Sequence, residues 1–304
     1  MFDPHKKKNQ HYVPQFWQRR FADENGVLYG VNRTTYNNTE KHTIKAVSPK
    51  KIMSDDWIYT VFDESGIASN RLENEAGDYE TKASQIMLLL DVPAYLGNIA
   101  EQKFLSWFVA FSALRHPGAM ARGHSLSKQL AYAFADVHTK NIDDYCLDLA
   151  RFGLPRGEAV SAYEKLRAYT EGQLLEMAEY IENLSPNDPV IPSQLAVYVE
   201  TIDILCLMLS TLKITILDVP TDFSFILGDT PFPLDLGLGF NIPLSSRLSL
   251  LWEVGDGSRY PEWSRRLATI NEVNISNKTQ ADNAAEMIIG SSQAVVKQYY
   301  WYTT

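Results

Sequence analysis

The sequence has 304 residues, 45% of them hydrophobic and 21% charged, which is typical of a globular protein with one large domain or two modest ones. The formal net charge of −9 excludes a molecule that is basic throughout, and two cysteines exclude a disulfide framework. No apolar run follows the first residues and the most apolar windows are too short to span a bilayer, so we expect a cytoplasmic protein with no membrane partner.

Basic residues are concentrated at the start of the chain. Residues 1–51 contain ten Lys and Arg and four Asp and Glu, a formal charge of +6, which leaves −15 on the remainder. A basic leading segment on an acidic body favours an anionic ligand or a nucleic acid as the partner that meets this end. The alternative is a solvated basic tail with no partner.

Strands are predicted in the first part of the chain. Residues 26–35 alternate apolar and polar side chains, residues 37–47 follow as a turn and a second strand, and residues 55–66 contain a short third strand. The first two make a predicted hairpin. Before them, the aromatic residues and Pro14 of "HYVPQFWQRRF" (residues 11–21) are expected to dock the chain start into the core.

Helical spacing of apolar residues predicts a succession of helices after these strands. They cover residues 70–91, 98–116, 124–141, 155–184 and 193–212. Pro117 ends the second of them, and the last is apolar around most of its circumference, which indicates a central buried helix.

The remaining sequence returns to strands. Residues 213–219, 222–227, 247–254 and 294–304 are predicted strands, residues 228–244 a loop and residues 262–291 a helical region. Together these elements predict an α+β fold, with a mainly helical body and a small mixed or antiparallel sheet built from N-terminal and C-terminal strands. We expect a single domain over residues 1–304, made of a strand segment 1–66, a helical body 67–213 and a strand and helix segment 214–304.

Acidic and imidazole side chains are the candidates for chemistry near the start of the chain. His11 lies eight and nine residues before Arg19 and Arg20; imidazole acts as an acid, base or metal ligand near neutral pH, and guanidinium binds phosphate. Glu73 and Glu80 are two turns apart on a predicted helix, so their carboxylates share a face about 10 Å apart. The alternatives are a histidine satisfied by backbone groups and a solvated acidic face.

Two further candidates follow apolar segments. Arg115 ends an apolar helix, where it binds an anion or complements the helix C-terminus. Asp229 follows a buried strand in "FILGDTPFPL", and such strand ends often carry catalytic residues, although an Asx turn is the alternative. No phosphate-binding loop or other standard catalytic motif is present. A divalent metal held by His11 with Glu73, Glu80 or Asp229 is left open, because the spacing is not specific for one.

The stretch "HYVPQFWQRRF" resembles the leading motif of the family called domain of unknown function 4238, usually His-Tyr-Val-Pro-Gln-Phe-Tyr-Leu-Arg-Arg-Phe. The likeness continues over most of the chain through "RLENEAGDYETKAS", "AFSALRHP", "FILGDTPF", "IPLSSRLSLLWE" and "INEVN". Trp17 and Gln18 replace the usual Tyr and Leu, and Gly228 replaces the usual Ser. The resemblance implies no particular activity, but it implies that the polar residues at its motif positions meet in space: His11, Gln15, Arg20, Glu73, Glu80, Arg115 and Asp229.

Three functions remain open. The first is a phosphodiester hydrolase such as a nuclease, with catalytic residues His11, Asp229, Glu73 and Glu80 and substrate-binding residues Gln15, Arg20 and Arg115. The second is a non-catalytic module that binds nucleic acid, nucleotide or protein in a pocket of these arginines with Tyr12, Phe16 and Trp17. In the third, "HYVPQF" is a structural plug whose His11 is bonded to Asp229 or to a backbone carbonyl.

Overall fold

A computed structural model of the chain describes residues 9–32, 43–56, 61–62, 68–69, 71–115, 132–150, 155–183, 205–206, 209–232, 239–255 and 260–300. For residues 61–62, 68–69, 71–75, 115 and 180–183 it describes the backbone alone. The chain forms two compact units, one of residues 1–116 with 189–304 and one of residues 117–188, and each is described by itself. The expected single domain with three segments stays a prediction.

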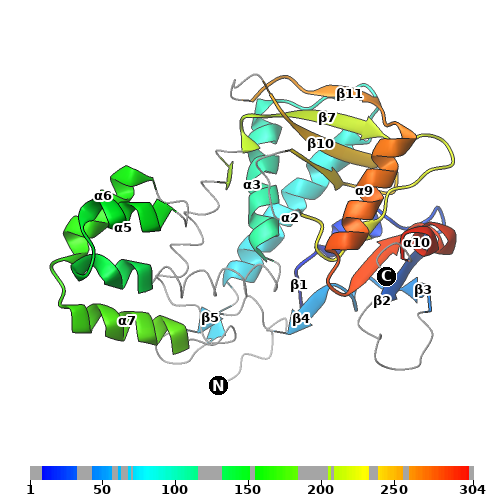
Figure 1. The fold of residues 1–304 in the computed structure, drawn as a ribbon. Coiled ribbons are helices and arrows are strands. Elements are labelled where there is room, and N and C mark those ends of the chain that lie inside the picture. Colours follow the sequence, from blue (N-terminus) through cyan, green and yellow to red (C-terminus); the bar gives the residue numbers. More distant parts are fainter. Residues whose placement is uncertain are drawn as a thin grey trace. The chain divides into compact units, whose positions relative to one another are not determined.

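In the first unit, an antiparallel sheet joins the two ends of the chain. Its strand order is β3-β2-β12-β8, with bounds β2 (Leu28–Asn32), β3 (Lys45–Val47), β8 (Leu227–Gly228) and β12 (Met287–Gly290). Val31 of β2 lies opposite Ile288 of β12, and Figure 1 shows the blue N-terminal strands beside the red C-terminal end. The structure therefore confirms the α+β class, the strands from both chain ends and the hairpin of β2 and β3.

A second, mixed sheet comes from the C-terminal part of the chain. Its order is β11-β7-β10-β9, with bounds β7 (Leu212–Asp218), β9 (Phe240–Pro243), β10 (Leu248–Val254) and β11 (Ser264–Leu267). β11 is parallel to β7 and the other pairs are antiparallel. The mixed and antiparallel pairing expected of one small sheet is thus divided between two four-stranded sheets.

The opening motif enters the core, as predicted. β1 (Asn9–His11) pairs with β4 (Ser54–Asp56), and α1 (Gln15–Arg19) follows directly. Trp17 is 1% exposed, its ring lies 5.7 Å from that of Phe232, and its Nε1 donates to the Pro243 carbonyl at 3.0 Å. Phe21 is fully buried. The Trp17 side chain is too enclosed to line an open pocket, so Trp17 is a core residue.

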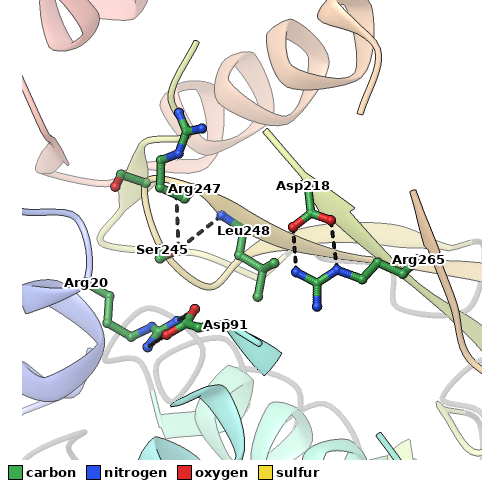
Figure 2. A pocket seen from close by; sticks show the side chains of 8 residues that line it. Arg20, Asp91, Asp218, Ser245, Arg247, Leu248 and Arg265 are labelled. Atoms are coloured by element: carbon green, nitrogen blue, oxygen red, sulfur yellow. Dashed lines mark hydrogen bonds and ion pairs between the residues drawn. The ribbon is translucent and has the colours of Figure 1, made fainter. Parts of the chain in front are cut away.

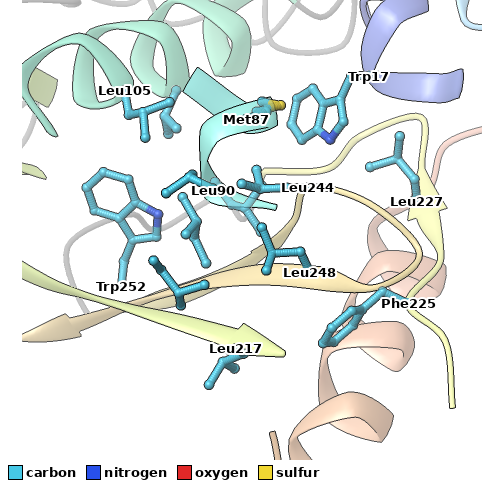
Figure 3. Close-up of a cluster of buried hydrophobic side chains, with 14 of the residues drawn as sticks. Trp17, Met87, Leu90, Leu105, Leu217, Phe225, Leu227, Leu244, Leu248 and Trp252 are labelled. Carbon is cyan, nitrogen blue, oxygen red and sulfur yellow. The ribbon is translucent and has the colours of Figure 1, made fainter. Parts of the chain in front are cut away.

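Two long helices support this core. α2 (Arg71–Leu90) and α3 (Ile99–Arg115) fall close to their predicted positions, and the structure also contains α9 (Ile270–Asn283), α10 (Gln293–Tyr300) and the small ladder of β5 (Val61–Phe62) with β6 (Ala68–Ser69). Figure 3 shows side chains of α1, α2, α3 and the mixed sheet meeting in one cluster: Trp17, Met87, Leu90, Leu105, Leu248 and Trp252 among them. Burial of this apolar area is the main source of stability for the unit.

The second unit is helical and has its own core. It contains η2 (Asp136–His138), α5 (Ile142–Ala150), α6 (Arg156–Leu166) and α7 (Glu171–Asn183). The prediction of one helix over residues 155–184 was wrong, because Thr170 starts a new one. The Thr170 Oγ1 accepts from the Gln173 amide at 3.3 Å and the Gln173 side chain accepts from the Thr170 amide at 2.9 Å, a reciprocal N-terminal cap.

Other predicted elements near the C-terminus need correction. Residues 294–304 were predicted as a strand, but α10 forms with Val296, Tyr299 and Tyr300 buried at helical spacing. β9 lies inside the predicted loop 228–244, and β11 and β12 lie inside the predicted helical region 262–291.

The predicted strand 222–227 is also wrong over most of its length. Only Leu227 of this stretch belongs to a strand, β8, which pairs with β12, because side chains of α9 bind the preceding backbone. The Asn277 amide accepts from the Ile226 N–H and donates to the Ser224 carbonyl at 2.9 and 2.8 Å. An amide side chain here supplies the bonds that a neighbouring strand would supply.

In the predicted helix 124–141, residues 132–138 are helical, whereas residues 124–131 lie outside the described residues. Most of the predicted helix 193–212 also lies outside them. Among the helices that are described, none is both long enough and apolar enough to cross a bilayer.

Candidate functional site

A pocket of about 390 Å³ opens where α2 ends against the mixed sheet. Eight residues line it, and they come from five separate stretches of the chain: Arg20, Asp91, Asp218, Ser245, Ser246, Arg247, Leu248 and Arg265. We call it the arginine pocket. In the view of Figure 2, Leu248 lies between an Arg20–Asp91 pair and an Arg265–Asp218 pair.

Arg20, directly after α1, is held on one side of the pocket. Its Nη1 and Nη2 donate to the two Asp91 carboxylate oxygens at 3.0 and 2.6 Å, a bidentate ion pair. Its Nε donates to the Leu244 carbonyl at 2.9 Å, and Nη2 also reaches the Met87 carbonyl at 3.4 Å. Four of the five N–H donors of a guanidinium are therefore engaged.

Arg265 of β11 is held in the same way on the other side. It forms a bidentate pair with Asp218, at 2.8 and 2.6 Å. Its Nη1 lies 2.9 Å from the Leu90 carbonyl and 2.8 Å from the Val92 carbonyl. Carbonyls at a helix C-terminus carry partial negative charge and lack helical partners, so Arg20 and Arg265 both stabilise the end of α2.

In both pairs the cation is the more buried partner. The Arg20 and Arg265 side chains are 13% and 9% exposed, while those of Asp91 and Asp218 are 44% and 38% exposed. Arg247 is exposed, and its Nη1 donates to the Phe223 carbonyl at 3.3 Å. Within the described part of the chain, Arg247 is the pocket arginine with no ion pair to a carboxylate. Figure 2 shows its guanidinium directed away from Arg20.

His11 and Gln15 lie in the opening motif. The Nε2 of His11 lies 2.9 Å from the Pro49 carbonyl, and its Nδ1 lies 3.4 Å from the Gln15 amide nitrogen. The Gln15 oxygen accepts from Arg19 at 2.8 Å. The His11–Pro49 contact is the backbone bond expected of a structural histidine.

Asp229 is fully buried and binds the backbone before β12. Its carboxylate accepts from the N–H groups of Ala285, Glu286 and Met287 at 2.8, 2.7 and 3.0 Å. Burial raises the pKa of Asp229, against the opposing effect of these three hydrogen bonds. The Asp229 carboxylate thus fixes the backbone that leads into β12 of the antiparallel sheet.

Tyr12 links the opening motif to this carboxylate electrostatically. Burial raises the pKa of the Tyr12 hydroxyl, and the negative charge of Asp229 raises it further. The carboxylate that pairs with Arg20 is Asp91, whereas the Asp229 carboxylate binds backbone N–H groups.

The remaining candidates lie on the long helices. Glu73 and Arg115 belong to α2 and α3, but their side chains lie outside the described part of the structure. Glu80 is half-buried on α2. No group of three or more His, Cys, Asp or Glu side chains in the described residues is placed to hold a metal ion. The catalytic and substrate-binding roles assigned from the sequence stay predictions.

Sequence reasoning missed most of the arginine pocket. Asp91 is the single charged residue in "LLLDVPAYLGNIA", and Asp218 ends the apolar strand "ITILD", so each carried a weak signal as an isolated charge. Arg247 and Arg265 stood in segments predicted only as strand and helix. The opening motif pointed to Arg20 alone.

Comparison with known proteins places the chain in a family. No curated protein and no solved structure matches it. The family model described as protein of unknown function (DUF4238) matches residues 9–294, nearly the whole chain, and the chain belongs to this family.

Proposed function

We propose that the chain is a non-catalytic binding module for a ligand that carries phosphate groups, such as a nucleic acid, with the arginine pocket as its binding site. The observation that carries the proposal is a 390 Å³ pocket lined by three arginines and two aspartates. Both aspartates are paired, and Arg247 remains as an exposed cation. Guanidinium is suited to this task because its planar donors match phosphate oxygens.

The charge distribution of the chain supports this assignment. Arg20 belongs to the basic segment 1–51, and the pocket has a formal charge of +1 within a molecule of net charge −9. A local excess of positive charge concentrates a polyanion near the surface where it binds.

A nuclease activity has less support from the described geometry. His11 contacts the Pro49 carbonyl and Asp229 binds three backbone N–H groups, which are contacts that hold the fold. A general base must reach the proton of its substrate or of a water. We therefore propose binding in place of hydrolysis, and test both together.

The test is a titration of a short fluorescein-labelled single-stranded oligonucleotide, followed by anisotropy, with magnesium or with chelator. We expect Arg247→Ala to weaken binding about tenfold, as for a lost charge-assisted hydrogen bond, and to reduce the salt dependence by about 0.7 in log–log slope. Arg156→Ala is the matched control, since Arg156 is 69% exposed and pairs with Asp143 at 2.6 Å.

Two results would contradict the proposal. One is equal binding by wild type and Arg247→Ala. The other is cleavage of the oligonucleotide, seen on a gel, that disappears in a folded His11→Ala variant; that result would restore the hydrolase hypothesis.

A further inference from the structure

We infer that Arg20 is a second anion subsite of the arginine pocket. The Asp91 carboxylate occupies this subsite in the absence of ligand, and a phosphate group of the ligand displaces it. The inference rests on the proposed function, because it concerns the same pocket. It adds that a ligand phosphate can bind Arg20 only by displacing the Asp91 carboxylate.

The geometry of the pair supports exchange. Asp91 presents two oxygens to two N–H groups of Arg20, at 2.6 and 3.0 Å, which is the arrangement that a phosphate also adopts on arginine. The carboxylate is 44% exposed, so a ligand reaches it from solvent, while the guanidinium beneath it is 13% exposed. An anion that approaches from solvent therefore reaches the Asp91 carboxylate before it reaches the Arg20 guanidinium.

Arg20 has anchors that do not depend on Asp91. Its side chain donates to the Leu244 and Met87 carbonyls, and its backbone carbonyl accepts from Ser246 at 3.1 Å. When Asp91 leaves, these contacts keep the guanidinium in place, so the subsite is preformed for an incoming oxyanion.

Asp91 is more easily displaced than Asp218. Asp218 is the last residue of β7, opposite Leu248 of β10 and Leu267 of β11, and its carbonyl accepts from Ala268 at 2.8 Å. Asp91 lies one residue beyond α2, in a turn where its N–H donates to the Leu88 carbonyl at 3.3 Å. A carboxylate at a helix C-terminus is also electrostatically unfavourable, so its position there depends on Arg20.

The ligand class follows from the two cations. Figure 2 shows the Arg247 guanidinium directed away from Arg20, so one compact anion does not serve both. A chain of linked phosphates serves both and gains from the high effective concentration of its second group. The structure therefore assigns an extended polyanion to the pocket.

The experiment repeats the oligonucleotide titration with Asp91→Asn. Removing the competitor raises the binding-competent fraction, and we expect about fivefold tighter binding, whereas Asp143→Asn, which breaks an exposed Asp–Arg pair, leaves the affinity unchanged. Asp91→Glu, which keeps the charge, should bind as wild type does. Unchanged or weaker binding by Asp91→Asn overturns the inference.

Hydrogen exchange separates displacement from simple loss of negative charge. In wild-type protein, exchange of Asp91 for ligand breaks its ion pair with Arg20 while Arg265 still holds the Leu90 and Val92 carbonyls, so the Asp91 amide, bonded to the Leu88 carbonyl, should exchange faster when the oligonucleotide binds. A fall or no change overturns the exchange while the proposed function stands. If neither wild type nor Asp91→Asn binds the oligonucleotide, the proposed function fails, and the inference with it.

Discussion

At the scale of single residues, Gly228 of β8 lies close against the backbone of α9. A Cβ atom at this position would lie 2.5 Å from the main-chain oxygen of Gln280. The Gly228 N–H donates to the Gln280 side chain at 3.0 Å, and the neighbouring Asp229 binds the backbone before β12. In this chain, therefore, glycine at position 228 leaves room for the backbone of α9.

We expect Gly228→Ala to lower the free energy of unfolding by about 1–3 kcal/mol, because the backbone of α9 must shift to admit the methyl group. Gly77→Ala is the matched control: a Cβ there meets nothing within 4 Å, and alanine should stabilise the interior of α2 by about 0.5–1 kcal/mol. Urea denaturation measures both changes. Equal effects of the two substitutions would show that Gly228 has no special packing role.

At the scale of elements, the start of α9 is set by a cap and an ion pair. Thr269 caps the helix, accepting from the Glu272 amide at 3.2 Å, while the Glu272 carboxylate accepts from the Thr269 N–H at 2.8 Å. The Arg266 guanidinium also binds this carboxylate, at 2.5 and 2.9 Å. The Arg266 guanidinium, with help from the Thr269 N–H, lowers the pKa of Glu272 to about 2 from its ordinary 4.5.

A lowered pKa in the folded state adds stability above the unfolded value of 4.5, and this stability is lost as the pH falls toward 2. Glu272→Gln should therefore reduce stability at pH 7 by up to about 1 kcal/mol, and the difference from wild type should shrink below pH 4.5. Thermal unfolding across this pH range measures it. Glu158→Gln, which removes an exposed carboxylate from the first turn of α6, is the control substitution.

At the scale of the whole molecule, the two compact units have separate hydrophobic cores. Buried residues of the helical unit include Tyr145, Leu149 and Tyr163, with the two tyrosine rings 5.2 Å apart in an edge-to-face arrangement. The core of the other unit includes Leu250 and Trp252 of β10. Separate cores allow each unit to open by itself.

Leu149→Ala should cost about 2–5 kcal/mol of local stability because it leaves a cavity in the helical unit. Hydrogen exchange should then accelerate in α5, α6 and α7 while β7 and β10 keep their protection. Leu250→Ala, with a buried leucine removed from the other core, should give the reverse pattern. Faster exchange throughout the chain in both variants would mean that the units unfold together.

Local pattern was sufficient for much of this fold. The spacing of apolar residues predicted α2, α3, β2, β7 and β10. Each of these elements has a buried face, and its apolar residues therefore recur along the chain with the period of a helix or a strand. It was not sufficient near the C-terminus. There, "AVVKQYYWYTT" has β-branched and aromatic residues typical of a strand, but its buried side chains are spaced as in α10.

Sequence patterns were enough to predict the α+β class and the burial of the opening motif, and to single out Arg20 as a residue of interest. The carboxylate that pairs with Arg20 is known only from the folded chain: it is Asp91, 71 residues away, just as Arg265 pairs with Asp218 across 47 residues. The physical reason is that helix and strand periods depend on neighbours along the chain, whereas an ion pair depends on where distant segments end in space. The arginine pocket exists only because the turns after α1 and α2 converge on the strands of the mixed sheet.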